Sequence, residues 1–445
     1  MPAASAQAAC GRRARHSNAC GVSNAGIETG RALPRALAAR LPFYYGWVVL
    51  ACLCCAGFAR QGAAVATFSV FVEPLTRDFG WSRTAVSGAV SLGGLLAALA
   101  APLIGTLVDR RGSRLVLCFA VIVSAVALWL LSLAPSLLVF YLLFCIARMC
   151  WAGPFELGIY AGLNNWFLAR RTTASSIANL VQMFGLVAMP LIAQFAIVHN
   201  GWRAGWIALG TTVLIVGLVP VALFLVRRPE DMGLAPDVAR VDPATGASAR
   251  VEPAFSRRQA MRTASFWLLL LYAVTIYPVQ AGVSLHQAAH LVHRGLDSTT
   301  AALIVSFFSL MSAVATIVCG FFPRRWPIRF PLAVAGLLAA AGTSLMPGIN
   351  SAADGYLAAG LFGAGMGSML TLLPVAWGDY FGRANYGAIR GLALPFQVLA
   401  QAAGPLVSGA LYDRTGSYTL SLHVFVGLAA LSTLAALIAR PPRRG

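Results

Sequence analysis

Long apolar stretches alternate with short polar ones along nearly the whole chain. Twelve of these stretches are long enough to cross a bilayer as helices, which takes about 20 residues each. We predict membrane-spanning helices at 44–71, 84–107, 115–134, 136–162, 173–197, 204–226, 264–287, 299–321, 330–347, 355–378, 391–411 and 418–439. The pattern therefore predicts an all-α polytopic membrane protein whose two ends lie on the same side of the membrane.

Composition supports this class and excludes several functions. Hydrophobic residues make up 59% of the chain and charged residues 11%, whereas soluble domains carry about 25% charged residues. The nine cysteines have no metal-ligand spacing, so we expect small hydrophobic side chains and neither a metal site nor a disulfide framework. Without a nucleotide-binding motif or a cluster of catalytic residue types, we predict no cofactor and no enzyme activity.

The basic residues indicate the orientation in the membrane. The net charge is +19, but the arginines gather at the ends of apolar spans, so the charge does not indicate a nucleic-acid partner. With the N-terminus placed inside, 26 arginines lie in inner segments and five in outer loops, while Arg60 and Arg148 lie within spans. This bias predicts cytoplasmic termini, and we expect a multi-pass protein of the bacterial inner membrane.

A polar, proline-containing segment at 227–263 divides the apolar spans into two sets of six. We interpret it as a cytoplasmic linker between an N-terminal half, 41–226, and a C-terminal half, 264–440. Residues 1–40 are rich in arginine and lack an apolar core, so we expect a disordered cytoplasmic tail there. Residues 441–445 form a short cytoplasmic tail.

The two halves resemble each other in sequence. GTLVDRRGSR (105–114) follows span two and GFFPRRWPIR (320–329) follows span eight, while WFLARR (166–171) and YFGRAN (380–385) follow spans four and ten. The two pairs are offset by 215 and 214 residues. Such a shared offset indicates a duplicated six-span unit with parallel halves.

The loop GTLVDRRGSR also resembles the signature loop of the major facilitator superfamily. This resemblance implies twelve helices in two pseudo-symmetric six-helix halves, and secondary transport by alternating access. It also implies that the loop helps to latch the halves together in one conformation, through Gly105, Asp109, Arg110 and Gly112. In the second copy of the loop, Arg324 stands in place of the aspartate.

Further segments are similar to the bacterial branch of the monocarboxylate transporter and oxalate–formate antiporter group. They are YGW (45–47), FGWSR (79–83), WFLARRTTASSIA (166–178), RRPEDMGLAPD (227–237) and GPLVSGALYDRTGSY (404–418). Members of that group often carry a basic residue in span eight or span eleven. Here 302–320 and 392–405 contain no charge, so we do not expect a dianion held by one cation from each half.

Two arginines inside spans are the main candidates for a binding site. An arginine at the bilayer centre costs about 2.5–3.5 kcal/mol on insertion scales, so Arg60 and Arg148 are expected to face protein or a water-filled cavity. A guanidinium matches a carboxylate with two parallel hydrogen bonds, which favours a small organic anion. A structural ion pair between helices is the alternative role for Arg60.

Polar uncharged residues could complete this pocket. Gln61 is adjacent to Arg60, and Tyr277, Gln397 and Gln401 lie on spans seven and eleven. The alternative for these residues is hydrogen bonding between helices, which is common in membrane bundles.

Proton coupling needs a group that can titrate in or near the site. Glu156 lies in span four, too far along the helix from Arg148 for a direct pair if that helix is straight. His286 and His290, near the outer end of span seven, are the other candidates.

Together these features predict a secondary carrier that moves a small organic anion, most specifically a monocarboxylate, with a proton or a counter-anion. Its other partners are membrane lipids, and we expect a monomer. An exporter of a drug-like or amphipathic compound is the first alternative. A transporter-like membrane sensor that does not transport is the second.

Overall fold

The computed structural model describes residues 25–237, 253–321 and 326–442, and its regular structure is helical throughout. The helices are α1 (Ala25–Arg40), α2 (Gly46–Arg60), α3 (Val65–Phe79), α4 (Arg83–Arg111), α5 (Ser113–Leu131), α6 (Leu137–Cys150), α7 (Glu156–Trp166), α8 (Arg171–Thr212), α9 (Val219–Phe224), α10 (Arg257–Met261), α11 (Ala264–His293), α12 (Ser298–Phe321), α13 (Arg329–Leu345), α14 (Ala352–Phe381), α15 (Tyr386–Thr415) and α16 (Thr419–Ile438). Short 3₁₀ segments lie at Gln61–Ala63, Pro229–Met232 and Met346–Gly348, and π-helical segments at Trp151–Phe155 and Val213–Leu218.

The described residues contain eleven helical segments that are long and apolar enough to cross a membrane. One of them, Arg171–Phe224, spans 54 residues and contains two crossings, because Gly201 bends α8 with a φ of 81°. Only glycine adopts such a φ readily. The all-α polytopic fold with twelve spans is therefore confirmed, and the predicted spans five and six meet at this bend.

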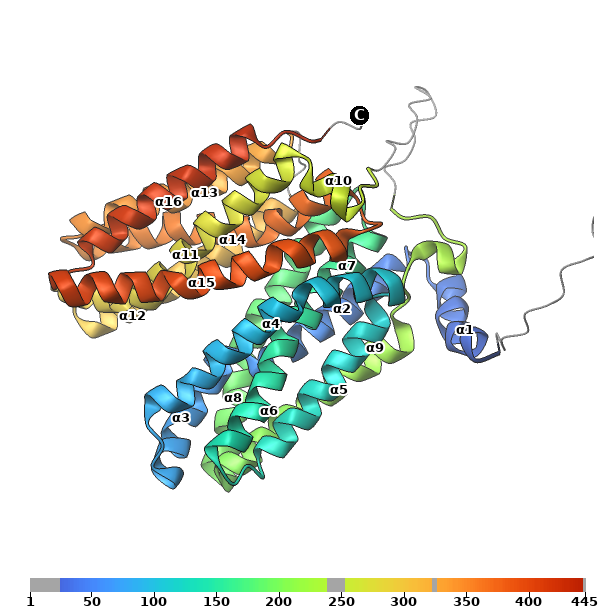
Figure 1. Cartoon of the computed structure of the whole chain (residues 1–445), viewed down its shortest axis with the longest axis horizontal. Helices are drawn as coiled ribbons and strands as arrows, with labels where there is room; N and C mark the ends of the chain where they lie inside the picture. Colours follow the sequence, from blue (N-terminus) through green and yellow to red (C-terminus); the bar gives the residue numbers. More distant parts are fainter. Residues whose placement is uncertain (1–24, 238–252, 322–325, 443–445) are drawn as a thin grey trace, which may run out of the picture.

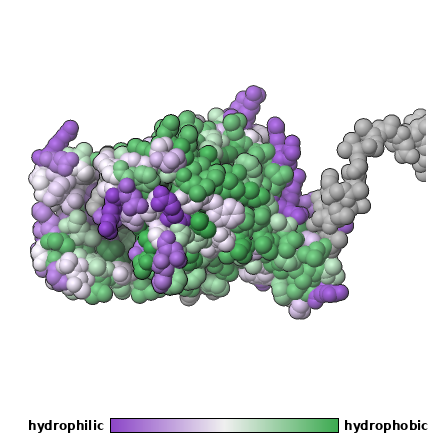
Figure 2. All heavy atoms as spheres, turned by 90° about the horizontal axis from the view of Figure 1, so that it is seen from below, coloured by the Kyte–Doolittle hydropathy of each residue, from purple (hydrophilic) through white to green (hydrophobic). Residues whose placement is uncertain are grey.

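Apolar side chains cover most of the molecular surface that Figure 2 shows. Leu99, Leu103, Leu133 and Leu406 are each at least 70% exposed. An exposed apolar area of this extent would cause a soluble protein to aggregate, whereas lipid tails solvate it. The exposed leucines thus mark the surface that faces the bilayer.

The helices gather into two bundles (Figure 1). The first contains α2–α9 and the second α11–α16, and each has its own core of buried hydrophobic residues. The bundles approach each other next to α10 and the C-terminal end of the described chain, and they diverge toward α3 and α12 (Figure 1). We call the end next to α10, where the bundles approach each other, the closed end.

Hydrogen bonds and ion pairs between the bundles concentrate toward the closed end. Arg171 of α8 lies 3.1 Å from Asp379 of α14, measured between Nη1 and Oδ1. Nearby, the Oγ of Ser175 donates to the carbonyl of Thr371 at 3.0 Å, and the amide of Asn179 donates to the carbonyl of Leu370 at 2.9 Å. These bonds close the space between the bundles at this end.

One predicted boundary differs from the structure, and the expected linker contains short helical segments. A disordered tail was expected through residue 40, but Ala25–Arg40 forms helix α1, whose Leu37 and Ala38 pack against the first bundle. The expected linker at 227–263 contains the 3₁₀ turn Pro229–Met232 and helix α10. Its residues 238–252, like residues 1–24 and Arg324, lie outside the described part of the chain.

Candidate functional site

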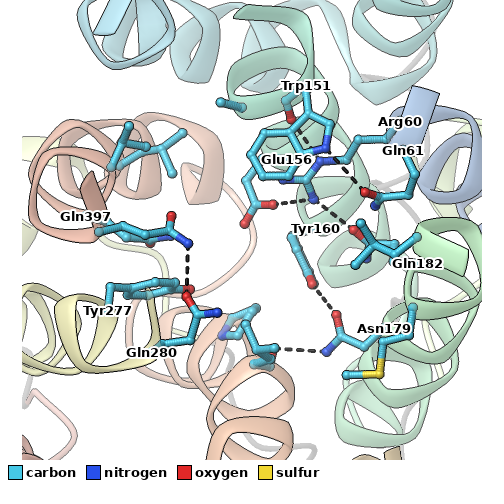
Figure 3. A pocket seen from close by; sticks show the side chains of 18 residues that line it. Arg60, Gln61, Trp151, Glu156, Tyr160, Asn179, Gln182, Tyr277, Gln280 and Gln397 are labelled. Carbon is cyan, nitrogen blue, oxygen red and sulfur yellow. Dashed lines mark hydrogen bonds and ion pairs between the residues drawn. The ribbon is translucent and has the colours of Figure 1, made fainter. Parts of the chain in front are cut away.

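A cavity of about 280 Å³ lies between the two bundles. Helices α2, α7 and α8 form one wall, and α11, α14 and α15 form the other (Figure 3). It is lined by Arg60, Gln61, Trp151, Ala152, Glu156, Tyr160, Asn179, Gln182, Met183, Leu186, Tyr277, Gln280, Leu370, Pro374, Leu394, Gln397, Val398 and Gln401. The cavity is lined by charged and polar side chains from both bundles, and we take it as the candidate binding site.

Two breaks in helices meet at this cavity. Helix α2 ends at Arg60 and passes through a 3₁₀ turn before α3 begins, and the fourth span is interrupted by the π-helical segment Trp151–Phe155. Pro154 lies within that segment and has no backbone N–H to donate. The guanidinium Nε of Arg60 donates to the carbonyl of Trp151 at 2.8 Å. The break after α2 thereby supplies the cation, and the break in the fourth span supplies a carbonyl that accepts its hydrogen bond.

Arg60 also forms an ion pair with Glu156. Its Nη1 lies 2.8 Å from Oε2 of Glu156 and donates to the side-chain carbonyl of Gln182 at 2.8 Å. The two charged side chains are about a tenth exposed, at 9% and 12%. A pair buried to this degree interacts strongly, and loss of either partner leaves a buried charge. The sequence analysis expected no direct pair for Glu156 with Arg148, and the partner comes instead from α2.

Arg390 is a buried cation beside the site that the sequence analysis did not name. It belongs to α15, is 1% exposed, and its Nη2 lies 3.6 Å from Oε1 of Glu156. Its Nη1 donates to the side-chain carbonyl of Gln397 at 2.7 Å. The second half therefore supplies a cation next to the site, which the sequence analysis did not anticipate, because helix α15 begins at Tyr386 and includes this arginine ahead of the predicted span 391–411.

Arg148 does not line the cavity. Its guanidinium carbon lies 3.8 Å from the ring centre of Trp151, and that of Arg60 lies 4.3 Å from the same ring. The indole is thus in contact with both cations. The Nη1 of Arg148 donates to the carbonyl of Ala63, just before α3, at 3.3 Å. Arg148 contacts the cavity wall, and Trp151 is the residue that reaches the cavity.

The predicted neutral residues all lie at the cavity. Gln61 accepts from the indole N–H of Trp151 at 3.3 Å. Tyr277, Gln397 and Gln401 line the opposite wall, and the amide of Gln401 donates to the side-chain carbonyl of Gln280 at 3.0 Å. Both roles considered for these residues, lining and bonding between helices, therefore occur together.

The two histidines lie elsewhere, within the second bundle. The ring of His290 is buried and its Nε2 lies 2.8 Å from the carbonyl of Met346. The Nε2 of His286 lies 3.4 Å from the carbonyl of Pro405, and its ring stacks on Tyr418. Neither histidine lines the cavity between the bundles. In the described part of the chain, Glu156 is the acidic side chain that does.

The C-terminal end of α4 joins the two bundles at the closed end. The carboxylate of Asp109 accepts from the backbone amides of Gly387 at 2.9 Å and Ala388 at 2.6 Å, at the start of α15. An anion is favourable at a helix N-terminus. Gly105 packs against the backbone of Gly387 so closely that a Cβ would lie 2.1 Å from its carbonyl oxygen.

In the described part of the chain, the other two residues of the predicted latch, Gly112 and Arg110, form no hydrogen bond or ion pair with the second bundle. Gly112 separates α4 from α5 with a φ of 87° and packs against the side chain of Arg227. Arg110 is exposed. The described residues contain no group of three His, Cys, Asp or Glu side chains arranged for a metal ion.

Comparison with known proteins agrees with this architecture. The family model described as Major Facilitator Superfamily matches residues 49–405. Mouse Monocarboxylate transporter 11 is 26% identical over 396 residues, covering 85% of this chain and 84% of that protein. The Membrane sensor protein UhpC of Salmonella typhimurium is 25% identical over 369 residues, covering 76% and 80%. The crystal structure of FucP, a Major Facilitator Superfamily transporter in the outward conformation, matches with a TM-score of 0.67 and 12% identity, covering 89% of this chain and all of that one.

Proposed function

Because the chain belongs to the Major Facilitator Superfamily, we propose that it is a secondary active transporter of a small organic anion, specifically a monocarboxylate. The protein is a multi-pass membrane transporter and not an enzyme. Its similarity to a monocarboxylate transporter supports the choice of substrate class. The two bundles would rock about the cavity between them, as expected for alternating access.

The ion pair of Arg60 and Glu156 is the observation that carries the proposal. Arg60 reaches the cavity from a break in the first span and already holds a carboxylate at 2.8 Å. A substrate carboxylate has the same charge and shape as the Glu156 side chain, so it fits the same donors. Arg60 and the neutral residues Gln61, Tyr277, Gln397 and Gln401 then form the binding site, and Arg148 supports it through Trp151.

Glu156 provides a route to proton coupling. When it is ionised it occupies Arg60 and lies beside Arg390; when it is protonated, both guanidinium groups are free to attract a substrate anion. Binding a proton and binding an anion would therefore favour each other. This role is assigned to Glu156 rather than to His286 or His290, since the histidines lie away from the cavity. Exchange for a counter-anion is the alternative coupling mode.

The distribution of arginines gives the proposed orientation. With both termini cytoplasmic, the closed end lies on the cytoplasmic side, and the structure is an outward-facing state. The closed-end contacts of Gly105 and Asp109 would then release as the cavity opens to the cytoplasm, while Gly112 keeps the turn between α4 and α5 and Arg110 lies at the membrane surface. We place the protein in the bacterial inner membrane, as a monomer.

Transport by the reconstituted protein tests this function. Proteoliposomes containing the full chain should accumulate a labelled short monocarboxylate when an inward proton gradient is applied. Arg60→Ala should lower uptake at least about 100-fold, because each of two hydrogen bonds to a charged group contributes about 1.5–3 kcal/mol. The matched control is Arg203→Ala, which removes an exposed arginine. Normal uptake by the Arg60 variant would contradict the proposal.

The same vesicles separate the alternatives. Similarity to a membrane sensor protein is the reason to test whether the chain binds its ligand without moving it. Such a sensor would bind substrate but fail to accumulate it. An exporter of an amphipathic compound would instead accumulate that compound in inside-out vesicles and ignore short carboxylates.

A further inference from the structure

The wall of the cavity opposite Arg60 has a distinct chemistry. Tyr277 and Gln280 come from α11, and Gln397 and Gln401 from α15; Figure 3 shows the first three facing the cavity across from Arg60. All four side chains are neutral and polar. This wall, which we call the amide wall, lies on the second bundle, whereas Arg60 and its carboxylate partner Glu156 lie on the first.

The hydrogen bonds within the amide wall fix what it offers to a ligand. A guanidinium only donates, so the Nη1 of Arg390 must meet the carbonyl oxygen of Gln397, and Gln397 is left with a free NH₂ group. Gln401 and Gln280 bond to each other through one NH₂ and one carbonyl. Whichever of the two amides donates, one NH₂ group and one carbonyl oxygen of the pair stay free to bond a ligand. The wall thus presents both donors and an acceptor.

A hydroxyl group matches such a wall, because it donates and accepts at the same time. A second carboxylate does not, since it only accepts and would be repelled by the free carbonyl. An alkyl chain would leave the amides without partners, and sites built to bond a hydroxyl discriminate strongly against ligands that lack one. The cavity volume of about 280 Å³ corresponds to about nine water molecules. A lactate-sized acid would leave much of this space to water.

We propose that the substrate is a polyhydroxylated monocarboxylate, with its carboxylate at Arg60 and its hydroxyl groups at Gln280, Gln397 and Gln401. This inference rests on the proposed function and narrows its substrate class to acids of the sugar-acid type. Apolar residues that line the cavity, such as Leu394 and Val398, would pack against the carbon chain.

Equilibrium binding to the purified full chain tests the inference, with the tryptophan fluorescence of Trp151 at the cavity as one readout. The probes are D-gluconate, hexanoate, adipate and D-glucose. Gluconate should bind at least about 10-fold more tightly than hexanoate or adipate, and glucose should bind more weakly than gluconate because it lacks the carboxylate. In the double variant Gln280→Leu/Gln401→Leu, the preference for gluconate over hexanoate should fall at least about 10-fold. Retained hexanoate binding shows that the variant is folded.

The outcomes distinguish this inference from the proposed function. If hexanoate or adipate binds as tightly as gluconate, or if the double variant keeps the preference for gluconate, the substrate class is wrong while anion transport stands. If none of the three acids binds, or if glucose binds as tightly as gluconate, the proposed function fails and this inference fails with it.

Discussion

Glu156 of the first bundle and Arg390 of the second lie 3.6 Å apart between the two bundles, measured between Oε1 and Nη2. The other carboxylate oxygen of Glu156 is bound to Arg60 at 2.8 Å. A single acid thus stands between two cations from different bundles. Any motion that separates the bundles changes the distance from Glu156 to Arg390 more than the distance to Arg60, since Arg60 and Glu156 belong to the same bundle. Charge and conformation are therefore linked at this carboxylate.

Replacing Glu156 with glutamine should abolish the response of transport to a proton gradient. The glutamine keeps the size of the side chain but cannot take up a proton, and it leaves Arg60 and Arg390 free at every pH. We expect uptake driven by an inward proton gradient to fall at least about 10-fold. Exchange of labelled for unlabelled substrate, which needs no proton, should continue and lose its dependence on pH.

Glu156→Asp serves as the control, since it retains a titratable group and should retain gradient-driven uptake. If Glu156→Gln still accumulates substrate against its gradient in response to pH, the coupling proton binds elsewhere. His286 and His290 would then be the next groups to test.

Close backbone packing at the closed end predicts a contrast between two glycines of α4. A Cβ on Gly105 would lie 2.1 Å from the carbonyl oxygen of Gly387, and the backbone there cannot move aside cheaply. A Cβ on Gly94 would meet its nearest neighbour, a methyl carbon of Val398, at 3.9 Å. Gly105→Ala should destabilise this conformation by about 1–3 kcal/mol and lower the melting temperature. Gly94→Ala should leave it unchanged, and equal effects would show that the contact of Gly105 is not tight.

Swapping the charges of the ion pair Arg171–Asp379 should partly restore the contact that a single substitution removes. The side chains are 5% and 19% exposed, and removing one partner of a buried pair costs about 3–5 kcal/mol. Because the pair joins the two bundles at the closed end, Asp379→Ala should shift the population toward the conformation that opens there, seen as altered substrate access from the two sides. The double variant Arg171→Asp/Asp379→Arg should restore part of the effect. Strictly additive single effects would mean that the two residues do not stabilise each other.

The sequence located the spans, the loop at 105–114 and an arginine within span one because each is visible in the local pattern. Apolar length defines a span, and an isolated guanidinium in a bilayer needs a polar environment. Local pattern also explains why Arg390 was missed. It lies in AIRGLA (388–393), just before the predicted start of the span 391–411, where an arginine is ordinary. One signal was available: Arg390 precedes Gln397 by seven residues, so the two share a helix face.

The pairing of Arg60 with Glu156 could not be derived from one sequence. The two residues are 96 positions apart, and their contact depends on breaks in two different helices. The sequence analysis predicted neither the 3₁₀ turn at Gln61–Ala63 nor the π-helical segment at Trp151–Phe155. Pro154 indicated a bend in span four, but not which cation the bend would face.

A contact outside the membrane predicts a small dependence of stability on pH. Glu230 is 47% exposed and pairs with Arg383 across the bundles. Partial burial raises the pKa of Glu230, but the hydrogen bond and charge of Arg383 outweigh it and hold the pKa below its ordinary value. The stabilisation is therefore fully present above the ordinary glutamate pKa of about 4.3 and is lost as the pH falls through the lower folded-state pKa.

For such an exposed pair we expect less than about 1 kcal/mol. Glu230→Gln should lower the melting temperature slightly at pH 7, and the difference from wild type should shrink on acidification below pH 4 and at high salt. If the difference in melting temperature between wild type and Glu230→Gln grows on acidification, the pKa of Glu230 is not lowered by folding.

Arg148 should affect substrate binding through Trp151 and not by direct contact. Its guanidinium packs on the indole ring at 3.8 Å, and a cation on an aromatic ring contributes about 0.5–2 kcal/mol. Arg148→Gln should therefore raise the KM for the carboxylate by about 2–30-fold without abolishing transport, unlike Arg60→Ala. In a Trp151→Leu background the same substitution should have little further effect, because the ring that transmits it is gone. If Arg148→Gln abolishes uptake in both backgrounds, Arg148 contacts the substrate directly in another conformation of the transport cycle.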